Sequence, residues 1–189
     1  MRYWRWGQGT GEQSPYEAEM IAYYILFYAG GTGGSKGISQ AGKGMEVLKT
    51  LTKLRQRPEV LRAPVVAFAL EVFAAMQNKQ YAVFFRLFRK PICFEYPLLA
   101  CMAQRYFSEV RMDGLKAMHK AWSHPHSLAK LMSVFGIDTV AQAAEFVTHY
   151  GLEVADLKGE LHCKFTLNRE QRRKFDRSVK AWVPGTCEL

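Results

Sequence analysis

The stretch "LAKLMSVFGIDTVAQAAEFVTHYGLEVADLKGELHCKF", residues 128–165, gives the clearest fold signal in the chain. Its first part predicts a short helix that ends at Gly136, and its second part predicts a helix that is capped by Asp138 and ends at Gly151. The remainder predicts two short strands around a Lys-Gly turn at 158–159. A helix, a turn, a second helix and a hairpin in this order predict a winged helix.

The residues before this stretch predict helices and no convincing strand. The first helix begins at Pro15, which suits the first helical turn, and ends at the glycines at 30–31. Its large apolar residues recur every three to four positions: Tyr16, Met20, Tyr23 or Tyr24, and Phe27. Further helices are predicted at 45–57, 64–78, 80–90 and 97–122, the last being one long helix or two that meet at Gly114. This spacing predicts antiparallel helix pairs that stack on one another.

These patterns divide the chain into four predicted parts. They are a loose lead-in at 1–14, a helical-repeat subdomain at 15–122, a winged-helix subdomain at 123–166 and a basic C-terminal segment at 167–189. The second and third parts together predict a mainly α fold.

Composition limits the classes of function. The 189 residues are 49% hydrophobic, too apolar for a disordered tail, yet no apolar run reaches the roughly 20 residues that span a bilayer. We therefore expect no membrane partner. The formal net charge of +9 favours an acidic protein or a nucleic acid as partner. The chain has four cysteines, Cys93, Cys101, Cys163 and Cys187. They are far apart in sequence and include no C-x-x-C pair, which favours reduced thiols and argues against a zinc site.

Residues 37–44, "GISQAGKG", come close to a phosphate-binding loop but have Gly44 where a Ser or Thr hydroxyl should reach Mg²⁺. A helix rather than a buried strand is predicted before them, so a flexible link between two helices is the better interpretation. His124 and His126 have no acid or thiol at ligand spacing and predict a solvated turn. Because no catalytic motif is present either, we expect no enzyme, no cofactor and no metal; a nucleotide-dependent enzyme is the rival.

Basic residues cluster after the predicted hairpin. They are Lys164, Arg169, Arg172, Arg173, Lys174, Arg177 and Lys180. If this segment is helical, several of them share one face and form a phosphate-binding strip, although a solvated charge run explains them equally well. The predicted helix at 139–151 has no Arg or Lys, and Glu145 would repel phosphate. Base reading by that helix is therefore not expected, and protein binding is favoured.

Two aromatic segments also have two interpretations each. In "QYAVFFRLFRK" the aromatic side chains at helical spacing are most simply core, namely Tyr81, Phe84, Phe85 and Phe88. Arg86, Arg89 and Lys90 then lie near solvent, where they could meet an acidic partner. Residues 2–6, "RYWRW", have the interleaving of a nucleic-acid stacking platform, or else form a tail that docks on its own domain.

Several ordered segments resemble the GANP family, that is, the Sac-three domain related to the PCI domains of the proteasome lid. They are "EAEMIAYYILFY", "NKQYAVFFRLFRKP", "LMSVFGIDTVAQAAEFVTHYGLEV" and above all "LLACMAQRYFSEVRMDGLKAMHKAW". The resemblance covers roughly residues 16–165. It implies stacked antiparallel helical hairpins of PCI/TPR-like type, followed by a C-terminal winged helix.

The resemblance implies a non-enzymatic scaffold of the nuclear transcription–export complex, which links transcription to messenger-RNA export at nuclear pores. In that family the domain pairs with a PCI-domain subunit, a small acidic Sem/DSS-type protein stabilises that subunit, and the joined surface contacts RNA or DNA without sequence preference. We expect the PCI partner to cover apolar surface around Phe135, Phe146, Tyr150 and Leu152. The alternative function is a sequence-specific winged-helix DNA-binding regulator.

Overall fold

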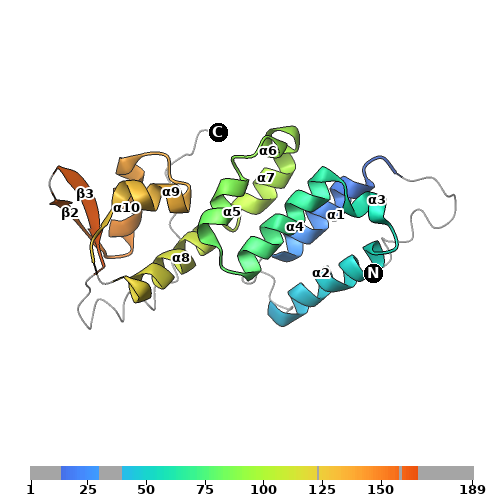
Figure 1. Cartoon of the computed structure of the whole chain (residues 1–189), viewed down its shortest axis with the longest axis horizontal. Helices are drawn as coiled ribbons and strands as arrows, with labels where there is room; N and C mark the ends of the chain where they lie inside the picture. Colours follow the sequence, from blue (N-terminus) through green and yellow to red (C-terminus); the bar gives the residue numbers. More distant parts are fainter. Residues whose placement is uncertain (1–13, 30–39, 123, 158, 166–189) are drawn as a thin grey trace. The chain divides into compact units, whose positions relative to one another are not determined.

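The computed structural model describes residues 14–29, 40–122, 124–157 and 159–165 (Figure 1). These residues form ten helices and a small sheet of three strands, so the predicted mainly α fold is confirmed. The helices are α1 Glu17–Ala29, α2 Gln40–Leu54, α3 Pro58–Leu61, α4 Pro64–Gln77, α5 Tyr81–Leu87, α6 Ile92–Glu95, α7 Pro97–Gln104, α8 Phe107–Ala121, α9 Leu128–Phe135 and α10 Val140–His149. The strands are β1 His126–Ser127, β2 Glu153–Leu157 and β3 Glu160–Lys164.

The described residues divide into two compact units. The first contains the residues up to Gln77 together with Lys90–Gln104, and the second contains Asn78–Arg89 together with the residues from Arg105 onward. Helices α5 and α8 therefore belong to the same unit as the sheet, although both precede residue 122. The division into a helical-repeat subdomain and a winged-helix subdomain at residues 122–123 stays a prediction.

In the first unit, α1 packs against α4 and also contacts α2 and α7 (Figure 1). The buried face of α1 consists of Ile21, Ala22, Ile25, Leu26 and Ala29. Burial of each large aliphatic side chain stabilises the fold by about 1.5–3 kcal/mol. The apolar repeat that identified this helix lies on another face, since Tyr16 and Met20 are 64% and 58% exposed. Because α1 is apolar on nearly all sides, its periodicity could not reveal its buried face.

Surface ion pairs join segments of the first unit. Arg57, before α3, forms a bidentate ion pair with Glu17 in the first turn of α1, and Arg57 Nη2 lies 2.7 Å from Glu17 Oε2. Lys90 Nζ lies 2.5 Å from Glu71 Oε2 of α4. The Lys90 side chain is exposed, as predicted, but it has a carboxylate partner within its own unit.

The second unit contains a sheet in the order β1-β3-β2, with both pairings antiparallel. The predicted hairpin is confirmed: Val154 of β2 lies opposite Cys163 of β3, and Gly159 in the turn has a φ of 83°. On its other side β3 pairs with β1, where His126 lies opposite Cys163. The prediction of a solvated turn at 124–126 is thus wrong at His126, which lies in a strand. Without β1, the backbone groups along this edge of β3 would have no strand partner.

In the second unit, the predicted helix ends at glycines are confirmed, but the predicted N-cap is not. Gly136 ends α9 in the left-handed conformation with φ 58°, and Gly151 follows α10 with φ 77°. The predicted cap Asp138 is wrong: Thr139 caps α10, and its Oγ1 accepts a hydrogen bond of 3.2 Å from the backbone N of Gln142. Thr139 has the extended backbone that brings a side-chain oxygen over the first turn.

Two other helix boundaries differ from the prediction. The break within 97–122 falls between α7 and α8, whereas Gly114 lies in the middle of α8. A Cβ at Gly114 would lie 2.6 Å from Cε1 of Phe135, so this glycine is needed for close packing rather than for a break. Helix α2 begins at Gln40, so the link that was predicted to run to Gly44 is shorter than expected, and residues 37–39 lie outside the described residues.

Within the described ranges, none of the helices combines the length and the apolar character that a membrane crossing requires.

Candidate interface in the α5–α10 unit

The four residues predicted to lie near a partner interface are buried in the second unit. Phe135 and Phe146 are 0% exposed, and Tyr150 and Leu152 are 5% and 2% exposed. The Phe146 ring lies 5.4 Å from both the Phe135 and the Tyr150 rings, so these side chains form an aromatic core between α9 and α10. A partner in this region would have to contact exposed apolar neighbours, of which Val140, Leu157 and Leu161 are between 40% and 44% exposed.

Only one residue of the predicted basic strip is described. Lys164 is half-buried at the end of β3, where it lies opposite Glu153 of β2. The other six lie outside the described residues: Arg169, Arg172, Arg173, Lys174, Arg177 and Lys180. Residues 2–6 also lie outside them. Both interpretations of the strip therefore stay predictions.

The second unit also contains a buried charge, Arg111, that was not among the predicted site residues. Arg111 of α8 is 4% exposed; its Nε donates to the Phe135 carbonyl and its Nη2 to the Gly136 carbonyl, each over 2.9 Å. The guanidinium carbon lies 5.1 Å from the Phe85 ring centroid and 5.5 Å from that of Phe107. Arg111 thus satisfies carbonyls at the C-terminus of α9 and fixes α8 to that helix end.

A sequence signal for Arg111 does exist. It lies four residues before Leu115 and three before Gly114, and both of these are buried in α8. An arginine within the buried stripe of a helix requires a polar partner, because a buried charge without one is costly. Its partner, however, lies 24 residues away in sequence at Phe135, and no local pattern identifies it.

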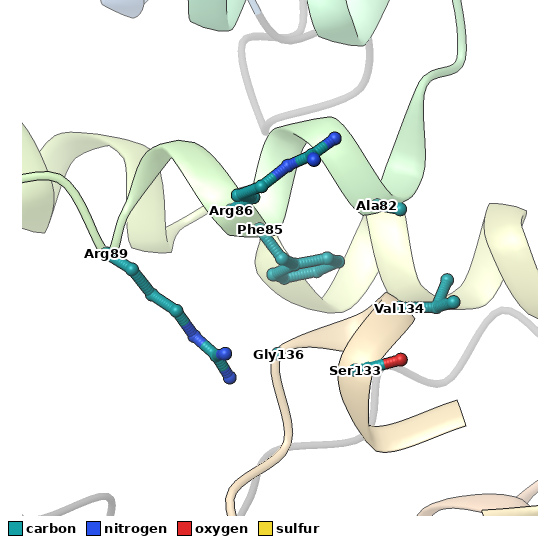
Figure 2. Close-up of a pocket in the computed structure, with 7 residues that line it drawn as sticks. All are labelled: Ala82, Phe85, Arg86, Arg89, Ser133, Val134 and Gly136. Atoms are coloured by element: carbon teal, nitrogen blue, oxygen red, sulfur yellow. The ribbon is translucent and has the colours of Figure 1, made fainter. Parts of the chain in front are cut away.

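Helices α5 and α9 border a pocket of about 240 Å³ in the second unit. Its lining residues are Ala82, Phe85, Arg86, Arg89, Ser133, Val134 and Gly136. Figure 2 shows Phe85 pointing from α5 toward α9, the Arg89 side chain extending past Gly136, and the Arg86 side chain directed away from α9. Arg86 and Arg89 are both exposed, as predicted from the helical spacing of the aromatic residues around them. The pocket itself depends on the approach of α9 to α5.

Two titratable groups among the described residues of this unit have pKa values shifted by burial. Burial raises the pKa of the Cys163 thiol to about 12, so this cysteine stays protonated and unreactive near neutral pH. Burial lowers the pKa of His126, with further lowering by Lys130, His124 and His162. The His126 ring centroid lies 3.7 Å from that of Trp122. Among the described residues, no three His, Cys, Asp or Glu side chains form a group that could hold a metal ion.

These observations define a mainly helical module with a small three-stranded sheet, a buried arginine and an arginine-lined pocket. The chain belongs to the SAC3/GANP family, whose family model matches residues 1–156.

Two curated relatives are similar to parts of the chain. SAC3 family protein 1 of Schizosaccharomyces pombe is 42% identical over 84 residues, which cover 43% of this chain and 8% of that protein. Protein xmas of Drosophila melanogaster is 25% identical over 152 residues, which cover 76% of this chain and 6% of that protein. The chain therefore spans less than a tenth of the length of either relative. No solved structure matches the chain significantly.

Proposed function

We propose that the chain is a non-enzymatic scaffold subunit of a nuclear mRNA export complex, in which it pairs with a PCI-domain subunit. The observation that carries this proposal is membership in the SAC3/GANP family over residues 1–156, which suggests a role in the mRNA export complex. In this proposal the chain acts in the nucleus, at nuclear pores, and a small acidic Sem/DSS-type protein accompanies the PCI subunit.

The arrangement of the described elements supports this assignment. After α5 and α8, the second unit continues in the order β1, α9, α10 and the β2–β3 hairpin, which is the order expected of a winged helix. In the first unit α1 packs along α4, and α2 and α7 flank α1, which fits stacked helices of PCI-like type. Exposed apolar side chains remain on the second unit, namely Val140, Leu157 and Leu161, and a partner subunit would cover them.

Co-expression with each nuclear PCI-domain subunit of the source organism tests the pairing. We expect one of them to co-purify with the chain as a stable complex, and the variant Val140→Asp/Leu161→Asp to bind it more weakly while melting at the same temperature. If the chain stays alone with every such subunit, the scaffold proposal is wrong.

We further propose that the chain contacts RNA or DNA through phosphates, without reading bases. Helix α10, which would be the base-reading helix of a winged helix, has no Arg or Lys, and its Glu145 is exposed. The overall charge of +9 and the basic segment after Phe165 favour contact with phosphates.

Mobility shifts at rising salt test this contact against the alternative of a sequence-specific DNA-binding regulator. A scaffold should bind unrelated sequences with similar affinities that fall together as salt rises, whereas a regulator keeps a large preference for one sequence. Replacement of Arg172, Arg173 and Arg177 by Glu should weaken binding to all sequences. Unchanged affinity would mean that these residues form only a solvated face.

A further inference from the structure

The arginines of the α5–α9 pocket differ from the paired cations of the described residues because they lack partners there. They differ from other exposed cations without such partners, for example Arg55 and Arg62, because they line a pocket. Arg57 is paired with Glu17 and Glu59, Lys49 with Glu46, and Lys90 with Glu71. For the exposed side chains of Arg86 and Arg89, the described part of the chain provides no hydrogen bond and no ion pair. Two planar guanidinium groups are therefore free to bind carboxylates from outside, in the bidentate geometry that arginine favours.

From this pocket we infer a second binding site on the chain: it binds an acidic segment of a protein partner, with Arg89 and Arg86 as carboxylate ligands. The site is separate from the proposed contact with a PCI-domain subunit and does not depend on it.

The wall of the pocket is rigid, which favours binding. Gly136 adopts φ 58°, and a Cβ there would lie 3.0 Å from Cδ1 of Phe85, so this wall requires a glycine. Behind it Arg111 holds the carbonyls of Phe135 and Gly136, and these two hydrogen bonds fix the end of α9 against α8. A wall that is already fixed loses little conformational entropy when a ligand binds.

The directions of the two arginine side chains distinguish their roles (Figure 2). The Arg89 side chain extends past Gly136, so it already lies beside the pocket, whereas Arg86 must change its rotamer to turn toward it (Figure 2). Exposed side chains change rotamers within nanoseconds, so this movement is not a barrier. The buried positive charge of Arg111 beneath the wall adds to the attraction for an anion. Arg89 should therefore contribute more to binding than Arg86.

The lining favours a peptide over a nucleic acid. Phe85 is the one aromatic ring among the seven lining residues, and at 4% exposure it offers no face on which a base could stack. The small side chains of Ala82 and Val134 leave room for an apolar side chain beside the carboxylates.

Selection of short random peptides displayed on phage against the immobilised full chain tests this site. The enriched peptides are then synthesised with a fluorescein label, and their binding is followed by fluorescence anisotropy, with labelled polyuridine as the nucleic-acid probe. We expect peptides with at least two acidic residues next to an apolar one, and weaker binding at high salt.

Variants decide whether the pocket is the site. Arg89→Ala should weaken peptide binding roughly tenfold, as expected for one lost charge-assisted hydrogen bond, and Arg86→Ala should weaken it less. Ala82→Trp, which fills the pocket without a change of charge, should also weaken it. The matched control is Arg55→Ala/Lys120→Ala, which removes two exposed cations elsewhere and should leave peptide affinity within about twofold. Equal melting temperatures confirm that each variant is folded.

Three outcomes would overturn the inference. The selected peptides could lack an excess of acidic residues, or the control pair could lose as much affinity as Arg86→Ala/Arg89→Ala. Alternatively, Arg86→Ala/Arg89→Ala could weaken polyuridine binding and leave peptide binding unchanged, which would make the pocket a nucleic-acid site.

Discussion

In the first unit a surface arginine has a partner within the fold, whereas in the second unit one arginine is buried and two exposed ones are unpaired. Arg57 joins the segment before α3 to α1 through Glu17. Arg111 instead satisfies backbone carbonyls in the core, and Arg86 and Arg89 line a pocket. The cations that form ion pairs in the first unit are thus neutralised by carboxylates of that unit, whereas the two pocket arginines of the second unit have no carboxylate partner among the described residues.

The largest expected loss of stability comes from a substitution in the aromatic core of the second unit. Phe146→Ala should lower the free energy of unfolding by about 4 kcal/mol, because it removes a fully buried ring that packs on Phe135 and Tyr150. Urea unfolding measures this loss. The control Phe27→Ala removes a ring that is 46% exposed in the first unit, and it should cost much less. Equal losses would contradict the burial of Phe146.

The buried arginine comes next. Arg111→Ala should lower the free energy of unfolding by about 3 kcal/mol, since it breaks two hydrogen bonds from a charged donor and leaves the Phe135 and Gly136 carbonyls without it. Arg111→Lys keeps the charge but cannot reproduce both bonds, so it should recover only part of the loss. Urea unfolding followed by circular dichroism gives both values, and full recovery with Lys would show that the two-bond geometry is unimportant.

The left-handed glycine should have an intermediate effect. Gly136→Ala should cost about 2 kcal/mol, because an L side chain is strained at φ 58° and its Cβ would press on the Phe85 ring. The matched control is Gly159→Ala, where φ is 83° but no atom lies within 4 Å of the added Cβ. The difference between the two melting temperatures isolates the contact with Phe85. A larger cost at Gly159 would argue against the close approach of α5 and α9.

The surface arginines compare the two units directly. Arg57→Ala should lower the free energy of unfolding by about 1 kcal/mol, because its pair with Glu17 is partly exposed and is screened by solvent. Arg86→Ala should leave stability unchanged, since that side chain stabilises no described neighbour. Thermal unfolding at low and high salt measures both, and the loss at Arg57 should shrink at high salt. A comparable loss at Arg86 would mean that the cations of the second unit also stabilise the fold.

The smallest effect concerns pH. The pKa of His126 is lowered in the folded chain, first by burial and then by Lys130, so the folded state binds its proton less readily than the unfolded state does. This contribution to stability is complete above the ordinary histidine pKa of about 6.5 and is lost as the pH falls through and below that value. His126→Phe should flatten the decline in melting temperature between neutral and mildly acidic pH. An identical decline in the variant would assign it to other groups.

Short-range signals predicted much of the second unit. The φ values of Gly136, Gly151 and Gly159 are positive, and each of these glycines ended a predicted helix or formed the predicted turn. The exposure of Arg86 and Arg89 also followed from helical spacing. The predicted interface stays a prediction. Helical spacing places Phe135 and Phe146 each on the apolar face of its own helix, but it does not show whether that face meets the same chain or a partner.

The mainly helical class, the hairpin and the helix ends at Gly136 and Gly151 could be predicted from the sequence, because they depend on backbone conformations that a few neighbouring residues favour or forbid. Four features became evident from the fold alone: the buried face of α1, the hydrogen-bond acceptors of Arg111, the pairing of β1 with β3 and the pocket that α5 and α9 border. Each of these depends on contacts between residues far apart in the chain, and such contacts leave no periodic trace in the local sequence.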